Sequence, residues 1–126
     1  MESVHLKIYE NRLYVATLIN DVLVDKISVA DALSKFPKDT DDINIKCAFD
    51  ALMHREADEE LRKKVADYAQ VQDEFLADLA QILRENQKLP KNIIDEYLEY
   101  HNDNLIGENL TFFKSVLKNF KRMINF

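Results

Sequence analysis

Residues 43–87 of the chain read INIKCAFDALMHREADEELRKKVADYAQVQDEFLADLAQILRENQ and contain neither glycine nor proline. Apolar residues recur in this stretch at steps of three and four, which is the spacing of one helical face. Ile45, Phe49 and Leu52 form a first run. A second run has one polar member, Gln72, and comprises Leu61, Val65, Tyr68, Gln72, Phe75, Leu79 and Ile82. The pattern predicts helix, with the apolar stripe in the core of a bundle.

A charged segment separates the two apolar runs. Residues 58–64 read DEELRKK, so each of three acids precedes a base by four residues. Such pairs stabilise a helix by about 0.2–0.5 kcal/mol each when the acid comes first. The segment is therefore predicted to be a solvated helix, paired as Asp58–Arg62, Glu59–Lys63 and Glu60–Lys64.

The length of residues 43–87 leaves two alternatives open. One straight helix would span about 67 Å, whereas a compact chain of this size has a radius of gyration of about 14 Å. The apolar stripe also thins between His54 and Glu60, where Ala57 is the only apolar residue. Either the chain bends there, with Asp58 capping a second helix, or a long helix projects and pairs with a partner, as in a coiled coil.

The first 27 residues are predicted to form three β-strands. Val4–Tyr9 alternates apolar and polar side chains, as a half-buried strand does. Leu13–Ile19 is apolar on both faces, and Val22–Ile27 would make the third strand. Residues 10–12 and Asn20-Asp21 have the composition of turns. Together these segments predict an antiparallel β-meander with helices over one face.

The remaining boundaries follow from capping residues and prolines. Ser28 and Asp31 resemble a capping box, so a short helix is expected from there to the residue before Pro37. Residues 40–42 place a cap and negative charge ahead of the central stretch. A further helix should open near Pro90, and a last one should cover residues 109–124. The fold class is therefore α+β: one domain, residues 1–126, with a β-meander at 1–27 and a helical part at 28–126 that holds three to four longer helices.

Composition excludes several functions. With one glycine in 126 residues, neither a phosphate-binding loop nor a dinucleotide fingerprint can be written. Cys47 is the only cysteine, which excludes an intramolecular disulfide and a thiolate metal cluster. The N-terminus lacks the apolar segment of a signal peptide, and no apolar run approaches the ~20 residues of a membrane span. We expect a cytoplasmic protein with no membrane partner.

Two histidines are the candidates for metal binding or catalysis. His54 lies near Glu56, Glu59 and Glu60, and His101 lies near Glu96 and Glu99. Neither has the Glu-x-x-His spacing of helical di-iron sites. We therefore expect no metal ligand, no catalytic residue and no cofactor. A small metal-binding protein or enzyme that uses His54 or His101 stays as the last alternative.

The charge distribution offers two candidate surfaces. The chain has net charge −6, but residues 110–126 contain four cations and no acid, so the remainder carries −10. The candidate interaction face consists of those cations, Lys114, Lys118, Lys121 and Arg122. The candidate acidic face consists of Asp58, Glu59, Glu60, Asp73, Glu74 and Asp78. A net negative protein lacks the broad basic footprint of direct nucleic-acid binding.

These observations favour a non-enzymatic protein–protein interaction module, a small cytoplasmic adaptor or accessory subunit. Its partner would be another protein, or a second copy bound through residues 43–87 as a homodimer. The alternative is an acidic inhibitor, or an immunity- or antitoxin-type protein, that masks a basic partner surface. Such a protein should gather its acids on one exposed face.

Overall fold

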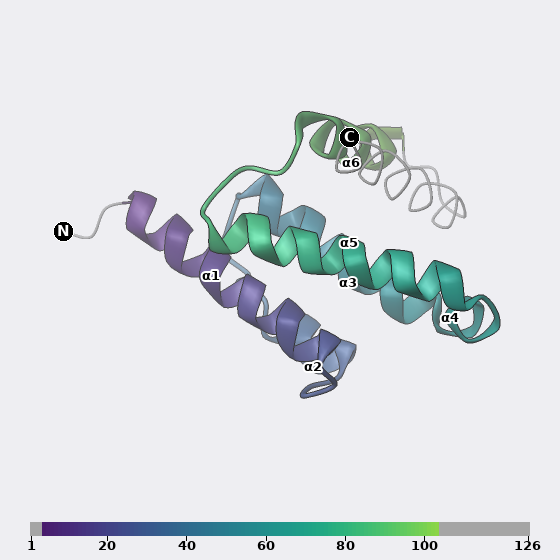
Figure 1. Cartoon of the computed structure of the whole chain (residues 1–126). Coiled ribbons are helices and arrows are strands. Elements are labelled where there is room, and N and C mark those ends of the chain that lie inside the picture. The colour runs from purple at the N-terminus through teal and green to yellow at the C-terminus, as the bar shows by residue number, and fades with distance from the viewer. Residues whose placement is uncertain (1–3, 104–126) are drawn as a thin grey trace.

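The computed structural model describes residues 4–103 and shows no strand among them. Its helices, in chain order, are α1 (Val4–Leu23), α2 (Val29–Ser34), α3 (Ile43–Ala57), α4 (Glu59–Lys64), α5 (Ala66–Arg84) and α6 (Lys91–Asp103). In Figure 1, α1 and α2 lie on one side of the α3–α5 pair, and α6 lies on the other. None of the helices within these residues is both long and apolar enough to cross a bilayer. The helix predicted for residues 109–124 lies outside the described part.

The predicted β-meander is wrong, and with it the α+β fold class. Residues 4–23 form a single helix of 20 residues, α1. The turn expected at residues 10–12 falls in the middle of this helix, and Asn20-Asp21 falls in its last turn. The Asn20 carbonyl accepts a hydrogen bond from the Val24 N–H at 3.1 Å, and the Asp21 carbonyl accepts one from the Lys26 N–H at 2.8 Å. The helix ends there because Asp25 has a φ of 60°.

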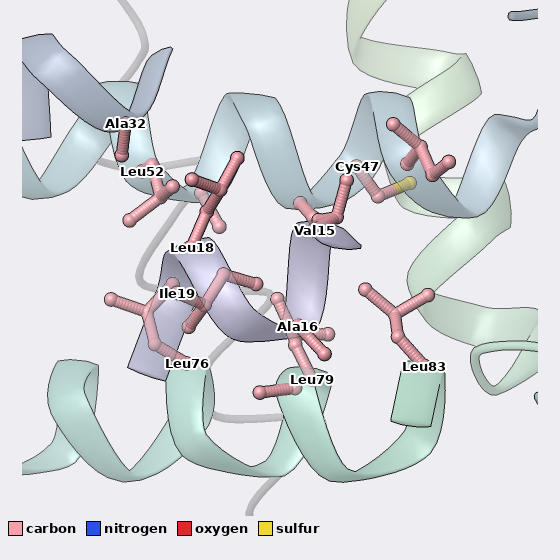
Figure 2. Packing of buried hydrophobic residues seen from close by; sticks show 14 of the residues in the cluster. Val15, Ala16, Leu18, Ile19, Ala32, Cys47, Leu52, Leu76, Leu79 and Leu83 are labelled. Carbon is pink, nitrogen blue, oxygen red and sulfur yellow. The ribbon is translucent and has the colours of Figure 1, made fainter. Parts of the chain in front are cut away.

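The core lies where α1 packs against both α3 and α5. Figure 2 shows Val15 and Leu18 on the side of α1 that faces α3, and Ala16 and Ile19 on the side that faces α5. The α3 and α5 partners named in that view are buried as well: Cys47, Leu52, Leu76, Leu79 and Leu83. Small side chains such as Ala16, which is fully buried, allow the helices to approach closely. Burial of this apolar surface, at about 25 cal/mol per Å², is the main stabilising contribution.

Residues 43–87 bend, as the first of the two alternatives predicted. The helix breaks at Asp58 and again at Val65, and α3 and α5 then pack against each other. Asp58 is the N-cap residue of α4, as predicted, but its side chain makes no capping hydrogen bond. Its carboxylate instead accepts a hydrogen bond from the Tyr68 hydroxyl at 2.6 Å. The break is thus stabilised by side chains of α5 rather than by a cap.

The ion pairs predicted around α4 form only in part. Glu59 and Lys63 pair at 3.7 Å, as expected, and Lys63 also lies 3.8 Å from Glu60. Arg62 turns inward and binds Asp73 of α5 at 3.0 Å. The segment is helical and contains no buried residue, as its charge pattern predicts.

Two predicted caps are confirmed. The Ser28 hydroxyl accepts a hydrogen bond from the Asp31 N–H at 3.0 Å and caps α2. The Asp42 carboxylate accepts one from the Asn44 N–H at 3.1 Å and caps α3. Pro90 precedes α6, and its carbonyl accepts the N–H of Ile93 at 3.0 Å. Helix boundaries were therefore predictable wherever a cap or proline marks them.

Candidate functional site

A groove of about 550 Å³ lies between α2, the loop after it, α3 and α6. Its described lining is mainly apolar and comprises Leu33, Ser34, Phe36, Pro37, Lys38, Thr40, Ile45, Lys46, Phe49 and Tyr97. A volume in the range of about 300–1,000 Å³ is typical of ligand-binding sites. We refer to this feature as the α2–α3 groove.

An aromatic pair forms the centre of the groove. Phe36 follows α2 and is buried, and its N–H donates a hydrogen bond to the Leu33 carbonyl at 3.3 Å. Its ring meets that of Phe49 on α3 edge to face, with centroids 5.3 Å apart and an interplanar angle of 79°. Such a pair contributes about 0.5–1.5 kcal/mol beyond its burial. Pro37, which cannot continue the helix, keeps Phe36 at this corner.

Tyr97 brings α6 to the groove. Burial raises the pKa of its phenol, and the nearby negative charge of Asp50 and the Cys47 side chain raise it further. The phenol is therefore neutral around pH 7, where it can donate or accept a hydrogen bond but cannot act as an ionised base. Its ring adds apolar surface to the lining.

The charge at the groove is opposite to that of the surrounding molecule. Lys38 and Lys46 are exposed, and they are the only charged residues in the described lining. Within residues 4–103 there are 13 Lys and Arg against 21 Asp and Glu, because four cations and two acids lie outside that range; the net charge of the described part is −8. The groove is thus a local cationic, apolar surface on an acidic domain.

The six residues of the predicted acidic face are not equivalent. Asp58 is turned toward α5, where it accepts the Tyr68 hydroxyl. Asp73 binds two arginines, Arg55 at 3.1 Å and Arg62 at 3.0 Å. Both carboxylates are therefore engaged inside the corner where α3, α4 and α5 meet.

The other four acids fall into two pairs. Glu59 and Glu60 are exposed on α4, where both lie close to Lys63. Glu74 and Asp78 lie one turn apart on α5. Burial raises the pKa of Asp78, and the charge of Glu74 raises it further. Glu59 and Glu60 thus form one pair of neighbouring acids, with Lys63 close to both, and Glu74 and Asp78 form another.

The predicted basic face, Lys114, Lys118, Lys121 and Arg122, lies outside the described residues. The same holds for the side chain of His101, although its backbone belongs to α6.

The candidate His54 and the single cysteine, Cys47, both lie on α3. His54 is buried, and its Nε2 lies 3.2 Å from the Asp50 carboxylate one turn earlier. Cys47 is buried too, and burial raises the pKa of its thiol to about 12, with smaller contributions from the charges of Asp50 and Asp42. A thiol of that pKa is protonated at neutral pH and is a poor nucleophile. Across residues 4–103, no three His, Cys, Asp or Glu side chains are grouped closely enough to hold a metal ion.

Comparison of the chain with protein-family models, with curated proteins and with solved structures found no match.

The sequence-based reasoning did not identify the α2–α3 groove. Its lining comes from a helix end, a loop and two other helices, so no single periodic pattern reveals it. Two local signals were present: Phe36 directly before Pro37, and Lys46 and Phe49 three residues apart on one side of α3. They become informative only once the two segments are placed side by side.

Proposed function

We propose that this protein is a non-enzymatic protein–protein interaction module whose α2–α3 groove receives side chains of a partner protein. The observation that supports the proposal is the groove itself, an apolar concavity built around the Phe36–Phe49 pair. Concave apolar surfaces rimmed by polar groups are typical of sites that bind a partner's anchoring side chains. An adaptor or accessory subunit is the class of protein that fits.

The chemistry of the lining favours binding over catalysis. No carboxylate, imidazole or thiol is among the described residues of the groove. Its one phenol, Tyr97, has a raised pKa. The groove therefore offers apolar burial and hydrogen bonds, without an acid–base pair of the kind that general catalysis needs.

The alternatives have less support. A homodimer through residues 43–87 would use the apolar stripe as its interface, but Ile45, Leu52, Phe75 and Leu79 are buried within the described fold. The inhibitor hypothesis depends on one acidic face, and Asp58 and Asp73 are engaged in intramolecular contacts instead. Among residues 4–103, the α2–α3 groove has the stronger support as a surface for a partner.

The test is selection of binding peptides from a random library displayed on phage, with the full chain as bait. Ser34 lines the groove and is exposed, so Ser34→Trp should fill the groove without disturbing the core. Ala77→Trp, at an exposed position on α5, is the matched control. We expect selected peptides to lose at least about 10-fold in affinity for Ser34→Trp, about 1.4 kcal/mol, and to bind Ala77→Trp as they bind wild type. Recovery of no peptide that responds to Ser34→Trp would refute the proposal.

A further inference from the structure

We infer that the segment bound in the α2–α3 groove is an acidic amphipathic peptide of another protein, with carboxylates that pair with Lys38 and Lys46. This inference rests on the proposed function and names the chemistry of the partner.

Two cations line the α2–α3 groove. Lys38 lies in the loop after α2 and Lys46 lies in the first turns of α3, so the two approach the groove from different elements. No acid is among the described lining residues, although the described part of the chain carries net charge −8. Opposite charge at a rim accelerates association and selects partners. The described lining is thus positive on a domain of net negative charge, although Asp39 and Asp41 in the same loop are exposed as well.

The rest of the described lining is mainly apolar, and we call its apolar part the floor of the groove. Phe49 is half-buried at the groove beside the buried Phe36, and Leu33 and Ile45 border them. A small polar anion would gain nothing from this surface. A segment that inserts apolar side chains at helical spacing and carries Asp or Glu beside them satisfies both the floor and the rim, as in helix-in-groove recognition.

Charge also argues against an occupant from the same chain. Residues 110–126 contain four cations and no acid, so they have the same sign as Lys38 and Lys46. Like charges brought together across an interface lower affinity and disfavour the wrong partner. An acidic segment of a different protein is the complementary choice.

The experiment uses the peptides that respond to Ser34→Trp and asks whether acids are enriched in them over the starting library. Each selected peptide is then synthesised with Glu and Asp, and again with Gln and Asn in their places. Binding to the full chain is measured by titration calorimetry at low and high salt. We expect the acidic forms to bind about 3- to 10-fold more tightly, which corresponds to two exposed charge pairs, and the difference to shrink as salt rises.

Two double variants locate the effect. Lys38→Gln with Lys46→Gln should weaken the acidic peptides about 3- to 10-fold and leave the neutral peptides unchanged. Lys64→Gln with Lys88→Gln makes the same change in net charge at exposed positions outside the groove and should have little effect. An equal loss in both double variants would show that only overall charge matters and would overturn the inference.

Three further outcomes separate the inference from the proposed function. Peptides that respond to Ser34→Trp without acid enrichment would overturn the acidic partner and leave the interaction module standing. Competition by a synthetic peptide of residues 104–126 would show that the chain's own segment is the ligand. A dimer by light scattering that dissociates when the acidic peptide is added would assign the groove to a second copy. Each of the last two also overturns the inference.

Discussion

The two ends of the α3–α5 pair are each held by an arginine, but the two arginines join segments that lie at very different separations along the chain. At one end, Arg12 of α1 binds Asp42 at 2.7 Å and Asn86 at 3.0 Å, which are 30 and 74 residues away. At the other end, Arg62 binds Gln72 at 2.6 Å and Asp73 at 3.0 Å. These partners are only 10 and 11 residues away. The first cluster can form only when the whole fold is in place.

The acids of the two clusters differ in exposure. The Asp42 side chain is 6% exposed and the Asp73 side chain 38% exposed, whereas Arg12 and Arg62 are similarly buried at 11% and 14%. Losing one partner of a buried pair leaves an uncompensated charge, which costs far more than losing one that water can reach. Two arginine clusters of similar composition therefore have different roles. The Arg12 cluster joins segments far apart in the chain, and the Arg62 cluster stabilises the local corner between α4 and α5.

The largest effect is expected for Arg12→Met. The substitution leaves the Asp42 carboxylate buried without its cation, so the free energy of unfolding should fall by about 3–5 kcal/mol. Urea unfolding followed by circular dichroism measures the loss, and the transition should stay single, because the cluster joins α1, the start of α3 and the loop after α5. The exposed Lys7→Met on the same helix is the control. A loss below about 1 kcal/mol would remove the distinction between the two ends.

A smaller and local effect is expected for Arg62→Met. Gln72 is fully buried and would lose the Arg62 donor, but Asp73 would keep Arg55 at 3.1 Å. We expect a loss of about 1–3 kcal/mol, with faster amide hydrogen exchange confined to α4 and the first turns of α5. Lys63→Met, at an exposed neighbour, should change little. Faster exchange throughout α1 as well would show that this corner is not local.

The stability contributed by Asp42 should depend on pH. Burial alone would raise the pKa of Asp42, but hydrogen bonds from Arg12 and Asn44 outweigh burial, and its pKa lies below the usual value of 3.8. A carboxyl with a lowered folded-state pKa stabilises the fold above its unfolded pKa, and this contribution is lost as the pH falls from about 5 toward the folded pKa. The difference in stability between wild type and Asp42→Asn should therefore narrow from pH 6 to pH 3. A difference that stays constant over that range would contradict the assignment.

The error at residues 4–27 has a physical cause. Leu6 and Tyr14 are exposed on α1 while Val15 and Ile19 are buried, so apolar side chains occur around the helix and blur its 3.6-residue period. The same residues alternate well enough to resemble strands, and valine and isoleucine favour that interpretation. Packing of α1 against α3 and α5 overrides this local preference for strand, as tertiary context often does. By contrast, the second apolar run has a clear helical period from Tyr68 to Ile82, and this part was predicted correctly as helix, α5. Residues 43–57 were also predicted correctly as helix, α3.

The polar residue in the predicted stripe was the sequence's best pointer to a specific interaction. Gln72 lies among apolar positions and is fully buried. Its burial is tolerated because Arg62 donates a hydrogen bond to its side-chain oxygen at 2.6 Å. Its partner could not be named from spacing, since the contact depends on the bend at Asp58. The groove was unpredictable for a related reason: Phe36 and Phe49 meet only after α2 and α3 pack together. Local sequence predicted the caps at Ser28 and Asp42 and the helix α5, whereas contacts between separate elements require the fold.

The smallest effect concerns an acid that lacks an arginine cluster. Burial and the charge of Glu74 raise the pKa of Asp78, the opposite of the change at Asp42. A raised folded-state pKa means that ionised Asp78 destabilises the fold above that pKa and that the cost disappears as the pH falls. Asp78→Asn should therefore stabilise the protein at pH 7 by up to about 0.5 kcal/mol and change nothing at pH 3. Urea unfolding at both pH values measures this, with Glu74→Gln expected to give a smaller gain of the same sign. Destabilisation by Asp78→Asn at pH 7 would show that the carboxylate has a favourable role, and the contrast with Asp42 would then fail.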